Sequence, residues 1–129
     1  GILLSKIQYI KKGAKKDFII IDAGMNDFMR PALYDAVHKI IPIRKSKSKL
    51  KGTIEFVGPI CESTCKFGSY KNYQKMSEND FVAITNVGAY GSSLSSNYNS
   101  RPLIAELLVN KNKIKYIRKK QDLLKLINS

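Results

Sequence analysis

The sequence lacks any hydrophobic run approaching the ~20 residues that a membrane-spanning helix requires, so we expect no such helix in it. Its amino end, Gly1 to Lys6, has neither a basic region nor a long apolar core and therefore does not resemble a secretory signal. The apolar content of 43% is ordinary for a folded protein. We expect one cytoplasmic globular domain that buries about two-thirds of its unfolded surface.

Cysteine and histidine are also scarce in the sequence. Cys61 and Cys65 are the only cysteines, and His38 is the only histidine. A zinc site would need more ligands, and a disulfide across four residues would add little stability. We expect reduced thiols, no metal, and a His38 that is a packed or surface residue rather than a catalytic base.

Acidic residues are few, ten against 23 basic residues, and the net charge is +13. Such a balance is typical of nucleic-acid-binding proteins. However, only four of the basic residues are arginines, which alone offer a bidentate fork to bases and phosphates. The lysines occur in scattered pairs, mostly at turns and termini. This pattern favours a solvated surface, and we expect no direct nucleic-acid function.

The apolar pattern predicts mainly strands. Alternating or continuous apolar runs of strand length occur at residues 2–11, 17–22, 37–43, 53–57, 81–85, 105–109 and 113–117. The run 17–22 indicates a strand buried on both faces, and 66–79, which has no period, is interpreted as a loop. Pro31 favours a short helix that begins there. The apolar residues of 122–127 favour a short amphipathic helix. The fold expected is all-β: a β-sandwich or partly open barrel with short helical turns and a C-terminal helix.

A thiol and a carboxylate stand side by side directly after one strand. Gly58 and Pro59 end the strand 53–57, and Cys61 and Glu62 follow. Loops at strand ends often present reactive groups. The alternative is a plain turn that holds a small buried cysteine and a solvated glutamate, since thiol reactivity depends on its surroundings.

Two further segments carry candidate binding residues. Arg30 precedes the short helix at Pro31 and Tyr34 lies four residues on, so that both could face one anion; the alternative is a solvated arginine and a core tyrosine. Tyr90 lies between glycines in a segment, 88–99, that is rich in small hydroxyl residues. Such a segment suits a phosphate or polar ligand, or else is a serine-rich linker.

These three segments resemble, in order and spacing, the carboxy-terminal part of diaminopimelate decarboxylase. They read Asp22-Ala-Gly-Met-Asn-Asp27 with Arg30-Pro-Ala-Leu-Tyr34, Gly58-Pro-Ile-Cys-Glu-Ser63, and Gly88 to Asn99 with Arg101-Pro102. The family consists of pyridoxal-phosphate decarboxylases with an alanine-racemase-like barrel and a β-sandwich domain. The resemblance spans essentially the whole chain. It implies conversion of meso-2,6-diaminopimelate to L-lysine and carbon dioxide.

The resemblance also implies roles for single residues. Arg30 and Tyr34 would bind the distal carboxylate of the substrate, and Glu62 its distal ammonium group. Cys61 would protonate the α-carbon after carbon dioxide leaves. Tyr90 would pack at the cofactor, pyridoxal phosphate, and at the substrate. In the family, the residues that match Cys61 and Glu62 serve the active site of the opposite subunit, which implies a homodimer.

Two departures from the family stand out. The family usually has an aspartate where Cys65 stands, which puts the order of this loop in question. The cofactor-binding barrel, with its Schiff-base lysine, precedes this segment in the family, and a barrel of about 250 residues exceeds the chain. We therefore expect residues 1–129 to be the C-terminal β domain alone. The alternative function is that of a non-catalytic basic β domain that binds a protein or nucleic acid.

Overall fold

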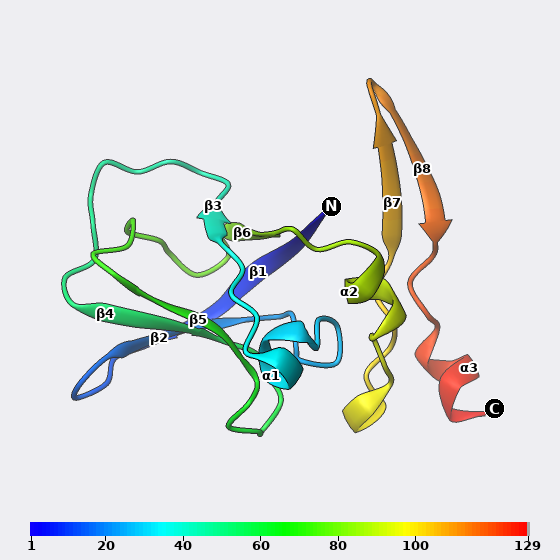
Figure 1. Cartoon of the computed structure of the whole chain (residues 1–129), viewed down its shortest axis with the longest axis horizontal. Helices are drawn as coiled ribbons and strands as arrows, with labels where there is room; N and C mark the ends of the chain where they lie inside the picture. The colour runs from blue at the N-terminus through cyan, green and yellow to red at the C-terminus, as the bar shows by residue number, and fades with distance from the viewer. Residues whose placement is uncertain (129) are drawn as a thin grey trace.

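The structure of the chain is a computed structural model that describes residues 1–128. Over this range it consists mostly of strands, with a few short helices (Figure 1). The strands are β1 (Ile2–Lys11), β2 (Asp17–Ile21), β3 (Ile40–Pro42), β4 (Thr53–Val57), β5 (Lys66–Lys71), β6 (Phe81–Thr85), β7 (Glu106–Asn110) and β8 (Lys113–Arg118). The helices are α1 (Arg30–Tyr34), α2 (Ala89–Ser93), the 3-10 turn η1 (Tyr98–Ser100) and α3 (Leu123–Ile127).

Six strands form one curled sheet in the order β3-β6-β1-β2-β4-β5. The long strand β1 pairs with β6 through its first half and with β2 through its second half, both antiparallel. A register shift between Ile7 and Tyr9 separates the halves, and such irregularities bend a strand. β2 pairs with β4 in parallel, so the chain between them crosses over through α1 and β3. This is the partly open barrel expected from the sequence.

The core lies inside the curl and follows the alternation of the strands. Leu3, Ser5 and Ile7 of β1 are buried while Leu4 is exposed. Ile54 and Phe56 of β4 are fully buried in the same way. A strand places every second side chain on one face, which is why the sequence pattern located these strands. The core also includes Ile19, Ile21, Phe28, Ile40, Phe67, Met76, Val82 and Ile84.

Two tyrosines link the open edges of the sheet, β3 and β5. Tyr70 Oη accepts a hydrogen bond from the Ile40 amide (2.9 Å) and donates one to the His38 carbonyl (3.2 Å). Tyr73 Oη donates to the Ile40 carbonyl (2.8 Å). Burial raises the pKa of both phenols, which therefore remain protonated. The hydroxyl groups thus satisfy the backbone of β3 where no strand covers it.

Strands β7 and β8 form a separate antiparallel hairpin beside the curled sheet (Figure 1). Arg118 Nε donates to the Ile104 carbonyl (3.2 Å), and Glu106 accepts from Ser92 Oγ (2.9 Å). Both contacts lie at the base of the hairpin, which otherwise projects away from the sheet. Large apolar side chains are exposed along it: Leu107, Leu108, Val109, Ile114, Tyr116 and Ile117.

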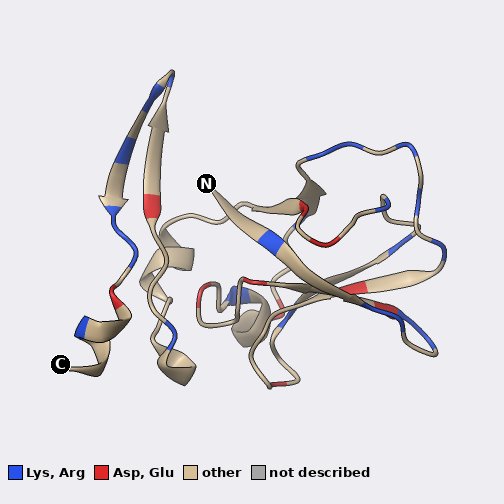
Figure 2. Ribbon diagram, turned by 180° about the vertical axis from the view of Figure 1, so that it is seen from behind, with Lys and Arg blue, Asp and Glu red and all other residues tan. Residues whose placement is uncertain are grey.

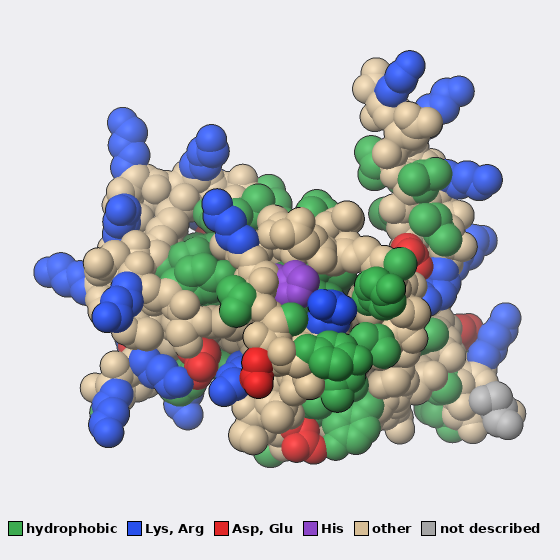
Figure 3. All heavy atoms as spheres, in the orientation of Figure 1, with side chains coloured by type: hydrophobic (Ala, Val, Ile, Leu, Met, Phe, Trp, Pro, Cys, Tyr) green, Lys and Arg blue, Asp and Glu red, His purple; other side chains and the backbone are tan. Residues whose placement is uncertain are grey.

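The basic residues gather in loops and along the hairpin. Figure 2 shows Lys and Arg in the β1–β2 turn, in the β3–β4 loop and along β8. Space-filling spheres show these side chains extending into solvent at both ends of the molecule (Figure 3). The ion pairs found within residues 1–128 are Lys12–Asp17, Lys16–Glu55, Arg44–Asp80 and Arg101–Asp27. Within the same range, no helix has the length and apolarity needed to cross a bilayer.

Three expectations about elements are wrong. Residues 66–79 are not all loop, because β5 pairs with β4 in an antiparallel ladder; Gly68 interrupts the apolar pattern that would have indicated it. The strand expected at 37–43 is shorter in the structure, where only Ile40–Pro42 (β3) forms a strand. His38 precedes β3, is buried, and packs edge-on against Phe28 with ring centroids 4.7 Å apart.

The third error concerns β2, which is fully buried on one face only. Ile19 and Ile21 are enclosed in the core, while Phe18 and Ile20 are only partly covered. The strands expected at 2–11, 53–57 and 81–85 are confirmed. The ends of β2, β7, β8 and α3 differ by one residue from those expected, as is usual where pairing rather than composition decides the last residue.

Candidate functional site

Three of the predicted site residues form one group on α1 and α2. The Arg30 guanidinium carbon lies 5.6 Å from the centre of the Tyr34 ring and 5.7 Å from that of Tyr90. Both distances are within the range of cation–π attraction. In the described part of the chain no carboxylate pairs with Arg30. Tyr34 is 60% exposed and Tyr90 70%, so a half-buried cation lies beside two phenols that face solvent.

The buried Gly91 brings α2 close enough for this group to form. A Cβ at this position would stand 2.7 Å from Val87 Cγ1 and 3.4 Å from the ring of Phe28. Phe28 is fully buried two residues before α1. The absence of a side chain at 91 therefore lets α2 pack directly against the segment that leads into α1. Tyr90, the preceding residue, is then carried next to Arg30.

Cys61 and Glu62 lie on a tight loop between β4 and β5. The Gly58 amide donates to the Cys65 carbonyl (2.9 Å), and the Cys65 amide donates to the Glu62 carbonyl (3.0 Å). Gly58 is needed here because a Cβ would stand 2.5 Å from Cys65 Sγ and 2.6 Å from the Ala23 carbonyl oxygen. The loop therefore turns sharply and exposes both Cys61 and Glu62.

Cys65, which stands where the family usually has aspartate, is buried beneath this loop. Its sulfur accepts a hydrogen bond from the Met25 amide at 3.4 Å. Thr64 Oγ1 also lies 3.5 Å from Met25 Sδ. A thiol is a weaker acceptor than a carboxylate, but here it joins the loop to the β2–α1 segment. Cys65 is thus part of the support of the loop, and Cys61 is the exposed thiol.

Tyr98 is a site residue to which the sequence alone gave no role. Its hydroxyl donates to Glu62 Oε1 at 2.5 Å. The hydrogen bond and the negative charge of Glu62 raise the pKa of Tyr98. The two residues are 36 positions apart, and no local pattern connects them. The signal in the sequence was that Tyr98 lies within Gly88 to Asn99, one of the three segments that carry the family resemblance.

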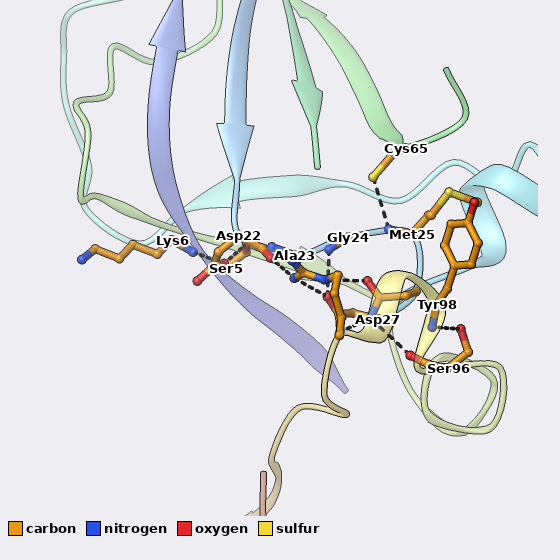
Figure 4. A network of polar contacts seen from close by, with 12 residues as sticks. Ser5, Lys6, Asp22, Ala23, Gly24, Met25, Asp27, Cys65, Ser96 and Tyr98 are labelled. Carbon is orange, nitrogen blue, oxygen red and sulfur yellow. Dashed lines mark hydrogen bonds and ion pairs between the residues drawn. The ribbon is translucent and has the colours of Figure 1, made fainter. Parts of the chain in front are cut away.

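A polar network fixes the segment that carries Tyr98 against the end of β2 (Figure 4). Arg101 donates from Nε to Asn26 Oδ1 (3.0 Å) and from Nη2 to the Asp22 carbonyl (2.7 Å). The Ser96 amide donates to the Asn26 carbonyl (2.9 Å). Asp27 accepts from the Gly24 amide (2.8 Å) and lies beside Arg101. Burial nevertheless raises the pKa of Asp27, because desolvation outweighs these contacts.

The site residues thus form two groups. Arg30, Tyr34 and Tyr90 are together, and Cys61 and Glu62 are together with Tyr98. Among the residues that the structure describes, no hydrogen bond, ion pair or ring contact connects the two groups. An open cleft of about 500 Å³ extends from Cys61 and Glu62 along β2 and β4 to Lys11. Chemically, the first group suits an anion, whereas the second offers a thiol and a carboxylate.

The curled sheet and the residues at its end define a class of protein, the sheet domain of pyridoxal-dependent decarboxylases. Residues 1–88 match the family described as "Pyridoxal-dependent decarboxylase, C-terminal sheet domain", and the chain belongs to this family. Similar chains are diaminopimelate decarboxylases. That of Helicobacter pylori is 46% identical over 123 residues, and that of Aquifex aeolicus 41% over 122 residues. Each alignment covers 95% of this chain, but only 30% and 29% of the relative.

Solved structures agree with this assignment. The H. pylori diaminopimelate decarboxylase complexed with L-lysine matches 98% of this chain and 31% of its own, with a TM-score of 0.85 and 43% identity. An arginine decarboxylase of a Chlorella virus, bound to agmatine, matches 76% of this chain and 27% of its own with a TM-score of 0.67. Its 13% identity shows a common fold only. The chain thus spans about 30% of the length of these diaminopimelate decarboxylases.

Proposed function

We propose that this chain is the sheet domain of a diaminopimelate decarboxylase, which converts meso-2,6-diaminopimelate to L-lysine and carbon dioxide in the cytoplasm as part of lysine biosynthesis. The observation that carries the proposal is the contrast between relatives. Diaminopimelate decarboxylases match 95% of the chain at 41% and 46% identity. Structures of decarboxylases acting on arginine or on lysine and ornithine match 76% of it at 13% and 18%.

Arg30 and Tyr34 are proposed to bind the distal carboxylate of the substrate. A guanidinium group offers paired N–H donors to a carboxylate, and a phenol adds a third. Arg30 has no competing carboxylate within residues 1–128. The flanking rings of Tyr34 and Tyr90 restrict where its guanidinium group lies. An anion entering from solvent therefore meets a cation that is already oriented.

Cys61 and Glu62 are proposed to have two further roles, one at the reacting carbon and one at the distal end of the substrate. The exposed Cys61 thiol would give a proton to the α-carbon that carbon dioxide has left. The Glu62 carboxylate would accept the distal ammonium group. We propose that both serve the active site of a second subunit. Their exposure, and the lack of a direct contact with the Arg30 group within residues 1–128, are consistent with such a dimer.

Pyridoxal phosphate, when bound, would supply the electron sink that decarboxylation requires. Of the residues in this chain, Tyr90 suits contact with such a group, since its ring is 70% exposed beside Arg30. We propose that the lysine that anchors the cofactor, and the barrel that contains it, lie in the part of the enzyme that the relatives have beyond this chain. The ring of Tyr90 would then form one side of the pocket that holds the cofactor and the substrate.

The proposal is tested by joining residues 1–129 behind the barrel of the H. pylori enzyme in place of its own sheet domain. The chimera should release lysine from diaminopimelate, whereas this chain mixed with pyridoxal phosphate should not. Arg30→Ala should lower kcat/KM about 100-fold, the loss expected for a charge-assisted contact of ~3 kcal/mol. Cys61→Ala should lower kcat by roughly 100-fold or more.

Lys47→Ala, in the basic β3–β4 loop, is the matched control and should leave both constants unchanged. Lysine release by the chain without a barrel would contradict the proposal. Full activity of both Arg30→Ala and Cys61→Ala in the chimera would contradict the roles assigned to them.

A further inference from the structure

The hydrogen bond between Tyr98 and Glu62 joins the β4–β5 loop to η1. Tyr98 Oη donates to one carboxylate oxygen of Glu62, Oε1, at 2.5 Å. In the described part of the chain no other hydrogen bond or ion pair reaches the Glu62 carboxylate. The second oxygen, Oε2, is therefore available to a ligand. A glutamate side chain that is free in solvent samples many rotamers, and this contact restricts them.

The segment that carries Tyr98 is held by hydrogen bonds of the residues around it. Asn97 Nδ2, in the adjacent residue, donates to the Arg101 carbonyl (2.8 Å) and to Gln121 Oε1 (2.6 Å). Arg101 in turn is bound to Asn26 and to the Asp22 carbonyl at the end of β2. The backbone that carries Tyr98 is thus anchored to the six-stranded sheet. The loop that carries Glu62 leaves the same sheet at β4.

We infer that Tyr98 is a positioning residue that holds the Glu62 carboxylate in place to accept the distal ammonium group of the substrate. This inference rests on the proposed function, in which Glu62 binds that group. A phenol that donates to Oε1 occupies that oxygen and leaves Oε2 to accept a hydrogen bond from an ammonium group. Without the phenol, Glu62 must be ordered by the substrate itself, and binding is weakened by the cost of that ordering.

A titration of this chain tests the pairing without any catalysis. Tyrosines labelled with 13C at Cζ are observed by NMR as pH rises, and the Tyr98 signal is assigned with Tyr98→Phe. Hydrogen bonding to Glu62 places the pKa of Tyr98 above its ordinary value of 10.0. In Glu62→Gln the midpoint of Tyr98 should fall towards that value, because the charge is gone. A midpoint that does not move would overturn the inference.

The role is tested in the chimera with two substrates, diaminopimelate and 2-aminopimelate, which lacks the distal ammonium group. Tyr98→Phe keeps the ring and removes the hydroxyl. It should raise KM for diaminopimelate roughly threefold to tenfold, with kcat and the KM for 2-aminopimelate nearly unchanged. Tyr9→Phe is the control: this tyrosine on β1 is similarly exposed, and no hydroxyl partner is found for it within residues 1–128. A merely structural role would affect both substrates alike.

The outcomes separate the two claims. If Glu62→Gln impairs diaminopimelate alone and Tyr98→Phe impairs neither substrate, the inference is wrong and the proposed function stands. If Glu62→Gln leaves KM for diaminopimelate unchanged, the role of Glu62 in the proposed function is wrong, and the inference fails with it. If the chimera is inactive, the proposed function is contradicted, and the titration alone decides whether Tyr98 holds Glu62.

Discussion

Arg101 and Asp27 lie 74 residues apart in the sequence, and Arg101 Nη2 stands 3.5 Å from Asp27 Oδ2. The Asp27 side chain is only 2% exposed. This pair joins the segment that carries Tyr98 to the turn that leads into α1. It therefore connects the chain that leads to Arg30 with the chain that carries Tyr98, the partner of Glu62.

Arg101→Ala should destabilise the domain strongly. The substitution leaves a buried carboxylate without its cation and removes the bonds to Asn26 and to the Asp22 carbonyl. We expect the free energy of unfolding to fall by about 2–3 kcal/mol, measured by urea denaturation. Arg44→Ala is the matched control, because Arg44 pairs with Asp80 while its own side chain is 71% exposed, and it should cost less than ~1 kcal/mol. Equal losses in the two variants would contradict the importance of the Arg101 network.

The cost of Arg101→Ala should depend on pH. Burial raises the pKa of Asp27 above its ordinary 3.8, so the folded state binds a proton more tightly than the unfolded state does. Asp27 therefore contributes stability at low pH that is lost as the pH rises through its folded pKa. Removal of Arg101 raises this pKa further, because the guanidinium group favours the charged form.

Consequently, Arg101→Ala should cost less at acidic pH, below the folded pKa of Asp27, than at pH 7. Urea denaturation at a series of pH values measures the difference. Asp27→Asn, which cannot titrate, should remove most of the pH dependence of the Arg101→Ala effect. A cost that is the same at acidic pH and at pH 7 would show that Asp27 does not titrate in this way.

Gly91→Ala should displace α2, and with it Tyr90 of the Arg30 group, although residue 91 is not a member of that group. The new methyl group would stand 2.7 Å from Val87 Cγ1, and a β-branched neighbour has little freedom to move. We expect a loss of stability of about 1–2 kcal/mol and a displaced α2. Thermal denaturation measures the first, and lysine release by the chimera should fall because Tyr90 moves. Gly88→Ala is the control, since a Cβ there meets nothing within 4 Å. If both alanine variants behave alike, packing at Gly91 does not position Tyr90.

The hairpin should make the isolated chain self-associate. Six large apolar side chains are exposed on β7 and β8, and an exposed patch of this kind normally indicates an interface. Val109 and Ile114 face each other across the two strands. Replacing both by threonine, which keeps β-branching, should lower the apparent mass in sedimentation velocity at high protein concentration. A chain that sediments as a monomer before any substitution would contradict this expectation.

The sequence by itself determined the elements that have a clear local period and the residues that belong to a motif. Alternation located β1 and β4, because every second side chain is buried from Leu3 to Ile7 of β1 and throughout β4. Pro31 located α1. The resemblance of the motifs around Arg30 and Cys61 to diaminopimelate decarboxylase led to the family, which the match over residues 1–88 confirms. The roles of these residues remain predictions.

The tertiary structure alone decided what depends on contacts between distant segments. It made β5 a strand, although Gly68 and the aromatic residues around it follow no period, because β4 supplies its ladder. It placed β2 parallel to β4, and it brought Tyr98 to Glu62 across 36 residues. Local patterns record which side chains share a face of one element. They do not record which element that face meets, since many pairings would bury the same apolar area and only the packing of the whole chain selects one.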